Sequence, residues 1–225
     1  MCSVRASDPD FDRTARARIR DAALALFGER GFDGTGMRAI AADAGVSPAL
    51  VIHHFGSKQG LREACDEHVA AVIRDNKHRA MSSGPPDPFQ LLRSADTAQP
   101  LLRYVARMLV DGSAGVENLV DTMISDAVEY MSAGVESGVL RPSEMPYERV
   151  VLLCIWQLGS VALHSHVKRL LDVDLLGDPA AIIRWGRPAV ELFTHGLFTD
   201  DRWEKALAAM EAEKSRGETE QEASK

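Results

Sequence analysis

The sequence of 225 residues predicts an all-α protein, and three observations lead to that class. Along most of the chain, apolar residues recur at spacings of three and four, as they do on one face of a helix. The alternation of polar and apolar residues that is typical of strands is not sustained anywhere in the sequence. Glycine, serine and proline interrupt the helical pattern in short segments such as 82–88, where helices are expected to end.

The first part of the chain predicts four helices, at 14–30, 37–44, 48–54 and 58–81. The first of them carries an amphipathic stripe of five apolar residues, namely Ile19, Ala22, Ala23, Leu26 and Phe27. Gly31 and Gly45 follow the first and second helices, at positions where a left-handed residue commonly ends a helix. Ser47 is a good N-cap and Pro48 suits a first turn, so together they mark the start of the third helix.

The breaker segment Ser82-Ser83-Gly84-Pro85-Pro86-Asp87-Pro88 separates these helices from the remaining ones. Beyond it, the sequence predicts helices at 89–94, 100–110, 115–137, 147–171 and 179–197. A last helix is expected to begin near Asp200 and to fray into the charged tail 211–225.

The net charge of −7 argues at first against a nucleic-acid partner, but its distribution matters more. Residues 1–60 hold 8 Lys and Arg against 7 Asp and Glu, whereas the remaining residues hold 18 against 26. A near-neutral head with clustered arginines on an acidic body is compatible with docking of the head to DNA.

Other features of the sequence bear on the cellular compartment. No apolar run approaches the roughly 20 residues of a membrane span, and no signal peptide is expected at the N-terminus. The three cysteines, Cys2, Cys65 and Cys154, are scattered and fit free thiols in a reducing compartment. We therefore expect a cytoplasmic protein without a membrane partner.

Residues 36–58 carry the most informative motif, because they predict two short helices joined by a tight turn. Gly45 ends the first helix, and the second opens at Ser47-Pro48 and closes near Phe55. This is a helix-turn-helix, whose second helix fits the major groove of DNA.

A wider set of residues extends this motif over about 13–65. The set comprises Ala22–Phe27 with Gly31-Phe32, Ile40-Ala41, Ala44–Ser47, His54-Phe55, and Lys58 with Leu61. In order and spacing this region resembles the TetR family of bacterial transcriptional regulators. The resemblance implies an all-α fold in which a three-helix DNA-binding head precedes a helical ligand-binding and dimerisation domain. It also implies a ligand-responsive regulator, most often a repressor, that binds a palindromic operator in double-stranded DNA as a homodimer.

The resemblance and the helical pattern together select the candidate DNA-binding residues. These are Arg38, Ser47, Pro48, Ala49, Ile52, His53, His54 and Lys58. Family members usually carry a tyrosine where this chain has Ile52, and the hydroxyl of that tyrosine meets a phosphate. Ile52 is restricted to apolar contact, for example with a thymine methyl group. Lys58 matches a phosphate contact at the start of a helix, and Arg38 matches a position that reaches a phosphate or a guanine edge.

The helical domain is expected to bind a small, largely apolar effector and to form the dimer. Candidate residues for the wall of the effector pocket are Phe89, Leu102, Met108, Met123, Tyr130, Trp156 and His164. The segments 147–171 and 179–197 hold more apolar residues than one buried stripe needs. The surplus suggests a four-helix bundle between two subunits, and the resemblance implies the same.

The expected organisation has five parts. They are a flexible arm at 1–12, the DNA-binding domain at 13–57, a connecting helix at 58–81, the effector-binding and dimerisation domain at 82–213, and a disordered charged tail at 214–225.

The sequence offers no motif for catalysis, cofactor binding or metal binding. It contains no Gly-x-Ser-x-Gly, Walker, Cys-x-x-Cys or His-Glu-x-x-His pattern. His53 and His54 are adjacent and would point about 100° apart on a helix, so they do not chelate one ion easily. We therefore expect no catalytic residue, metal or cofactor. The alternative to a repressor is a metabolite-binding or protein-interaction module that retains a residual DNA-binding head.

Overall fold

The structure is a computed structural model that describes residues 9–83, 88–112, 115–178 and 180–223. Side chains are described within these ranges except at 9–13, 83, 88–97, 182, 215 and 217–223. Every regular element in the described ranges is an α-helix, as the sequence predicted. In chain order they are α1 (Pro9–Arg30), α2 (Met37–Asp43), α3 (Pro48–Phe55), α4 (Lys58–Ser83), α5 (Pro88–Asp111), α6 (Val116–Glu136), α7 (Pro146–Ala162), α8 (His164–Leu171), α9 (Ala181–His195) and α10 (Arg202–Ala223).

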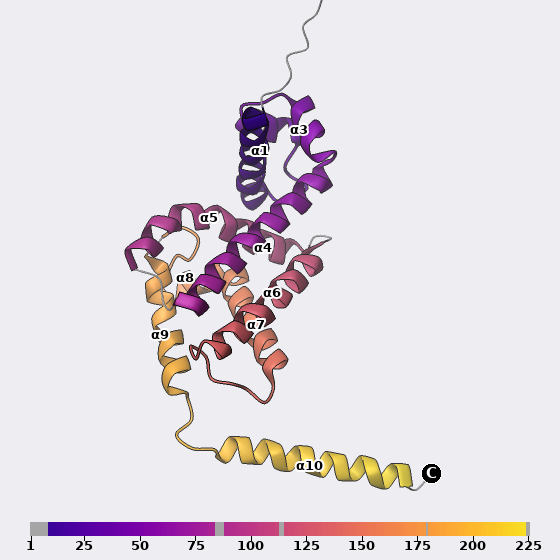
Figure 1. The fold of residues 1–225 in the computed structure, drawn as a ribbon, viewed down its shortest axis with the longest axis vertical. Coiled ribbons are helices and arrows are strands. Elements are labelled where there is room, and N and C mark those ends of the chain that lie inside the picture. Colours follow the sequence, from indigo (N-terminus) through magenta and orange to yellow (C-terminus); the bar gives the residue numbers. More distant parts are fainter. Residues whose placement is uncertain (1–8, 84–87, 113–114, 179, 224–225) are drawn as a thin grey trace, which may run out of the picture. The chain divides into compact units, whose positions relative to one another are not determined.

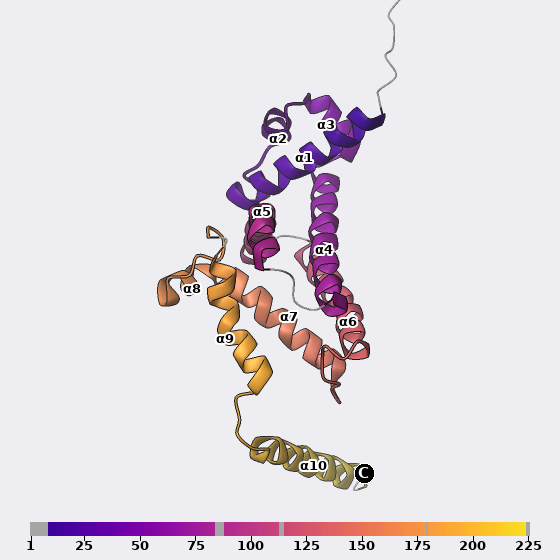
Figure 2. The ribbon, with the colours of Figure 1, turned by 60° about the vertical axis from the view of Figure 1, so that its left-hand side comes forward.

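The chain divides into two compact units, Met1–Ala181 and Ile182–Lys225, which are described separately. Within the first unit, α1, α2 and α3 gather at the N-terminal end of α4 (Figures 1 and 2). The second unit holds nearly all of α9, and α10 follows it.

The core of the head forms as the amphipathic pattern predicts. Ile19, Ala23 and Phe27 of α1 are fully buried against Ile40 of α2 and Val51 of α3. Each fully buried aliphatic or aromatic side chain stabilises the fold by about 1.5–3 kcal/mol relative to an exposed one. The spacing of apolar residues on three short helices therefore specifies the three-helix head.

The same core extends beyond the head into α5. Leu101, Tyr104 and Met108 belong to the cluster that contains Phe27, and the rings of Phe27 and Tyr104 lie 6.4 Å apart. Gly28 makes this approach possible, because a Cβ atom there would lie 3.1 Å from the backbone nitrogen of Tyr104. The head and the first body helix consequently share one hydrophobic core.

A second, smaller core lies further along α4. Ala127 and Tyr130 of α6 and Val150 of α7 are buried there, and Met81 at the end of α4 packs against them. Helix α4 thus contributes side chains to both cores and connects the head to α6 and α7 (Figure 1).

The expected break between helices at 89–94 and 100–110 is wrong, because α5 is continuous from Pro88 to Asp111 with Pro100 inside it. Proline removes one hydrogen bond and is unfavourable by about 3 kcal/mol in a helix interior. The residues that follow it bury Leu101, Tyr104 and Val105 in the main core. This packing offsets the unfavourable helix propensity of Pro100. The sequence alone shows the proline and not the packing, so it predicts a break.

The single helix expected at 147–171 is also wrong, because α7 and α8 are separate helices that meet at an angle of 74°. Gly159 and Ser160 lie in the last turn of α7, and the Ser160 hydroxyl donates to the carbonyl oxygen of Gln157 at 2.7 Å. Glycine and serine are weak helix formers, and such side-chain bonds compete with helix continuation. The apolar periodicity runs through the bend and does not reveal it.

The two ends of the chain also differ from expectation. Helix α1 begins at Pro9, inside the arm expected at 1–12, and proline is favoured in a first helical turn. Helix α10 continues to Ala223, through most of the tail expected to be disordered, because that tail is rich in the helix formers Ala, Glu, Lys and Gln. Residues 1–8 and 224–225 lie outside the described residues.

Among the described helices, none is by itself long and apolar enough to cross a membrane, and α7 with α8 passes that test only as a bent pair.

A buried hydrogen bond of Tyr104 offers a test of this packing. Its hydroxyl donates to Oδ1 of Asp66 at 2.6 Å, and its ring is fully buried. Tyr104→Phe should lower the free energy of unfolding by about 1–3 kcal/mol, because it leaves a largely buried carboxylate without that donor. Urea unfolding measures the change, and Tyr147→Phe, at an exposed position of α7, is the matched control. Equal stability of the two variants would show that the hydrogen bond contributes nothing.

Candidate DNA-binding face and connecting-helix groove

The helix-turn-helix is built as the motif predicts. Gly45 adopts a φ of +65° in the turn after α2, a left-handed conformation that glycine tolerates best. The side chain of Ser47 accepts a hydrogen bond from the backbone nitrogen of Leu50 at 3.2 Å, and Pro48 is the first residue of α3. This N-cap fixes the start of α3, while Val51 anchors its inner face in the head core.

The outer face of α3 presents five of the eight candidate DNA-binding residues. Ser47, Pro48, Ala49, Ile52 and His53 are all exposed, and Ile52 retains 48% of its accessible surface. An exposed isoleucine of this kind, on a helix whose other side is buried, is available for contact with a thymine methyl group. Arg38, near the start of α2, is also exposed.

The other two candidates, His54 and Lys58, lie differently. His54 is half-buried, and its ring centroid is 5.5 Å from that of His53 and 6.1 Å from that of Phe55. Lys58 is also half-buried, with its ammonium 4.3 Å from the centroid of the Phe32 ring. Both residues belong to the junction between the head and α4, where the side chain of Ser57 accepts from the backbone nitrogen of Gly60 at 3.0 Å.

The seven candidate pocket residues are distributed over different parts of the chain. Met108 is buried in the main core, where Met123 packs against it, whereas Tyr130 belongs to the second core. Leu102 and His164 are half-buried, and Trp156 is 41% exposed on α7. The side chain of Phe89 lies outside the described residues.

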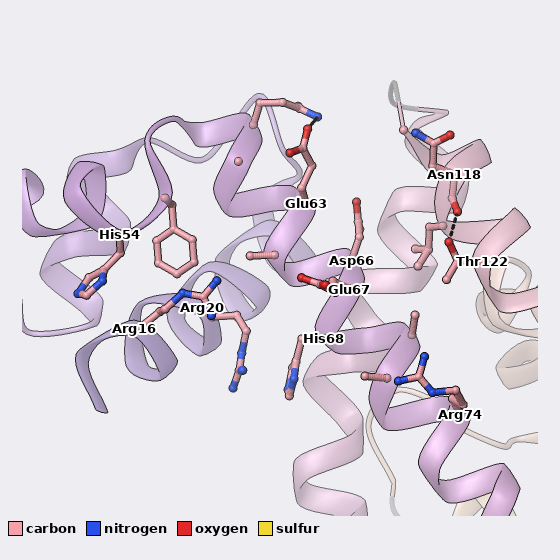
Figure 3. A pocket seen from close by; sticks show the side chains of 18 residues that line it. Arg16, Arg20, His54, Glu63, Asp66, Glu67, His68, Arg74, Asn118 and Thr122 are labelled. Atoms are coloured by element: carbon pink, nitrogen blue, oxygen red, sulfur yellow. Dashed lines mark hydrogen bonds between the residues drawn. The ribbon is translucent and has the colours of Figure 1, made fainter. Parts of the chain in front are cut away.

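A groove of about 980 Å³ runs beside α4, and none of those seven residues lines it. Figure 3 shows Arg16, Arg20 and His54 on one side of α4 and Asn118 and Thr122 of α6 on the other. Its lining is mostly polar and comes from α1, the end of α3, α4 and the start of α6, with Glu63, Asp66, Glu67, His68 and Arg74 supplied by α4. Sequence reasoning missed the groove because its walls come from residues as far apart in the chain as Arg16 and Thr122.

A buried polar network lies behind the wall of the groove. Arg62 is 2% exposed, and its Nε lies 3.8 Å from Oδ2 of Asp66. The other carboxylate oxygen of Asp66, Oδ1, accepts a hydrogen bond from the hydroxyl of Tyr104. Burial raises the pKa of the Asp66 carboxyl above its ordinary value, although the Tyr104 hydrogen bond and the charge of Arg62 act in the opposite direction. Burial and the nearby Asp66 likewise raise the pKa of Tyr104, so its hydroxyl stays a donor at neutral pH.

Among the described residues, no group of three or more His, Cys, Asp or Glu side chains is placed to hold a metal ion. The rings of His53 and His54 of α3 lie edge to face, inclined at 62° to each other.

Comparison with known proteins shows which family has this architecture. Residues 19–65 match the family described as bacterial regulatory proteins, tetR family, and residues 96–199 match the tetracyclin repressor-like C-terminal domain. The chain is 40% identical over 203 residues to the HTH-type transcriptional regulatory protein RaaS of Mycobacterium tuberculosis, which covers 88% of this chain and 93% of that protein. It is also 40% identical over 76 residues to the regulator BetI of Burkholderia thailandensis, over 32% of this chain and 37% of that protein.

Two solved structures share the fold. A TetR-family regulator from Streptomyces coelicolor superimposes with a TM-score of 0.53 at 19% identity, over 90% of this chain and 98% of that one. Reduced NemR of Escherichia coli gives a TM-score of 0.53 at 18% identity, over 68% of this chain and 88% of that one. With the helix-turn-helix described above and both family domains in order, the chain belongs to the TetR family and is a helix-turn-helix transcriptional regulator.

Proposed function

We propose that this protein is a homodimeric repressor that binds a palindromic operator and is released from it by a small, largely apolar effector. The observation that carries the proposal is the outer face of α3, which is exposed from Ser47 to His53 while Val51 fixes the helix to the head. Two such heads on a twofold axis would read two half-sites whose centres lie roughly 34 Å or somewhat more apart. We place this activity in the cytoplasm and assign it no catalytic role.

Direct contacts to DNA are assigned by position. Ser47, Pro48, Ala49, Ile52 and His53 would meet base edges and nearby phosphates, and Arg38 would add a phosphate or guanine contact. Lys58 and His54 would act at the start of α4, where Lys58 exchanges its contact with the Phe32 ring for a phosphate. This exchange replaces a cation–π contact by a charge-assisted one.

Exposed apolar side chains support the dimer. On α7, Leu152 and Ile155 are exposed while Val150 and Leu158 are buried, so two faces of this helix are apolar. In the second unit, α9 exposes Ile183, Val190 and Phe193. Large apolar side chains at helical spacing on a soluble chain mark an interaction surface, and a second copy of the chain is the partner that we propose.

The proposed division of labour follows the order of the helices. Residues 13–57 bind DNA, 58–81 connect, and 82–213 bind the effector and the second subunit. Helix α4 contributes side chains to both cores. A ligand that binds one conformation of the body more tightly would therefore also shift the conformational equilibrium of the heads. Phe89, Leu102, Met108, Met123, Tyr130, Trp156 and His164 remain the proposed pocket residues.

A gel shift with DNA flanking the gene tests the proposal as a whole. A folded dimer should give a specific shift that scrambled DNA does not compete away, and transcription from that promoter should fall when the protein is added. If a folded dimer gives no specific shift at low salt, the repressor proposal is contradicted. The alternative, a metabolite-binding or protein-interaction module with a residual DNA-binding head, would then be favoured.

Variants of the head separate phosphate contacts from base contacts. Lys58→Ala should weaken binding to all sequences and reduce the salt slope of log K by about one, because one phosphate contact is lost. Ile52→Ala should change the difference in binding free energy between the preferred operator and its base-pair variants by about 1–3 kcal/mol. The salt slope should stay unchanged, because no phosphate contact is lost. Fluorescence anisotropy over a salt series measures both effects, with Lys205→Ala on α10 as the control for a lost surface charge. Identical behaviour of the two head variants would refute these roles.

The dimer surface is tested by placing a charge on it. Leu152→Glu should shift the chain toward monomers by at least about tenfold in dissociation constant, because an unpaired carboxylate is expensive to bury. Analytical ultracentrifugation measures the shift. Val139→Glu, at another exposed apolar position between α6 and α7, is the matched control and should remain dimeric. A dimeric Leu152→Glu protein would remove this face of α7 from the interface.

A further inference from the structure

Among the described side chains, Arg62 is the cation that is most completely removed from solvent. It lies one turn after the start of α4 and is 2% exposed. A buried guanidinium carries a large desolvation cost and is normally matched by hydrogen bonds to an anion. The groups around Arg62 therefore show whether its charge is matched within the protein.

The neighbours of Arg62 match its charge incompletely. Its Cζ lies 5.2 Å from the centroid of the Phe32 ring, which is a cation–π contact. Oδ2 of Asp66 is 3.8 Å from Nε, beyond hydrogen-bond distance, and Oδ1 of that carboxylate accepts from Tyr104. Among the described residues, neither Nε nor Nη2 of Arg62 finds a hydrogen-bond acceptor.

Instead of an acceptor, the guanidinium faces the N-terminus of α6. Gly115 is the N-cap of that helix with a φ of +97°, and it provides no side-chain cap. A Cβ atom on Gly115 would lie 3.2 Å from Nη2 of Arg62, so the absence of a side chain leaves this approach open. The first helical hydrogen bond runs from Leu119 N to Gly115 O, and the earlier amides of α6 therefore have no partner within the helix.

The guanidinium of Arg62 thus lies beside a helix N-terminus, and the nearby acidic residues are Asp66, 3.8 Å from Nε, and Glu117 in the first turn of α6. The N-terminus of a helix carries about half a positive charge, and its free amides are a common binding site for carboxylate and phosphate groups. A guanidinium beside it repels the helix end unless a negative group bridges the two. The arginines that line the groove lie elsewhere, since Arg20 pairs with Asp21, Arg74 pairs with Asp126, and Arg16 stacks on Phe55. Arg62 also has an ion pair, with Asp66, and a ring contact, with Phe32, but its guanidinium is buried beside a helix N-terminus.

The groove along α4 passes beside this position, and Arg62 itself is buried behind its wall. Asp66, Gly115, Asn118 and Leu119 all line it, and Asn118 lies at its α6 side in Figure 3. Glu63, Asp66 and Glu67 all line the groove, so a general attraction of anions along its length is not expected. A negative group is favoured at the α6 end, where the helix terminus and Arg62 act together.

We propose that this end of the groove binds the carboxylate or phosphate group of a small molecule, held by Arg62 of α4 and by the first-turn amides of α6. The site is separate from the proposed apolar pocket and from the outer face of α3. Its existence does not depend on the proposed repressor function. Its use as an effector site does rest on that function, because a ligand that joins α4 to α6 would act on the helix that carries the head.

The test uses the full-length protein and simple anions at constant ionic strength, adjusted with sodium chloride. Inorganic phosphate and acetate are titrated separately, which distinguishes a phosphate site from a carboxylate site. The backbone amide signals of Val116, Glu117 and Asn118 should shift with a common saturation curve for at least one of the two anions. Shifts confined to the start of α4 at Lys58 and Gln59 would indicate a DNA-phosphate contact and would overturn the proposal.

Two variants then identify the donors. Arg62→Met keeps the side-chain volume and should weaken anion binding by at least about tenfold, since charge-assisted hydrogen bonds are lost. Asn118→Asp leaves the buried network intact and places a negative charge in the first turn of α6. It should maintain or raise the Tm through the helix dipole while weakening anion binding severalfold.

Ser125→Asp is the matched control for Asn118→Asp, because it adds the same charge at an exposed position two turns further along α6. It should bind the anion as the wild type does, since screening limits charge effects beyond about 8 Å at physiological salt. Equal anion affinity of Asn118→Asp and Ser125→Asp would overturn the proposal, whether or not Arg62→Met folds.

Discussion

The contact between α1 and α5 is the constraint on which the rest of the first unit depends. Phe27 lies at its centre, with the Phe32 ring 5.4 Å away on the head side and the Tyr104 ring 6.4 Å away on α5. Gly28 allows the two helix backbones to approach, and α2 and α3 pack against α1 in the same core. The DNA-binding face is therefore held in place by a helix that is itself anchored in the body.

The second connection between head and body is α4, and its character is polar as well as apolar. Leu61 and Cys65 face the main core, whereas Arg62 and Asp66 place charge behind the groove. Buried charges of this kind contribute little to stability by themselves, and removal of one partner is costly because the other remains buried. A negative group bound at the proposed Arg62 site would therefore act on charges that α4 holds behind the groove.

The parts of the fold that sequence reasoning predicted are those specified locally. The helix-turn-helix follows from Gly45, Ser47 and Pro48, whose caps and turn act within a few residues. Pro100 and the bend after Gly159 were misjudged, because tertiary packing overrides a proline in one case and periodicity conceals a bend in the other. The outer face of α3 was also predictable, since one buried residue, Val51, fixes which side is exposed. The Arg62 site was not, because Gly115 is brought to it only when α6 packs on α4.

The shared core has a consequence for the modularity of this regulator. Because related regulators have heads of the same fold, a chimera could join the head of one protein to the body of another. Binding to one operator would then respond to the ligand of a different protein. Here the surface that Phe27 covers on α5 belongs to the body, and a head excised at residue 57 would expose it to water. A functional chimera would therefore have to carry the complementary part of α5 with the head. The segment of this chain that would have to be transferred as one piece is thus larger than the helix-turn-helix.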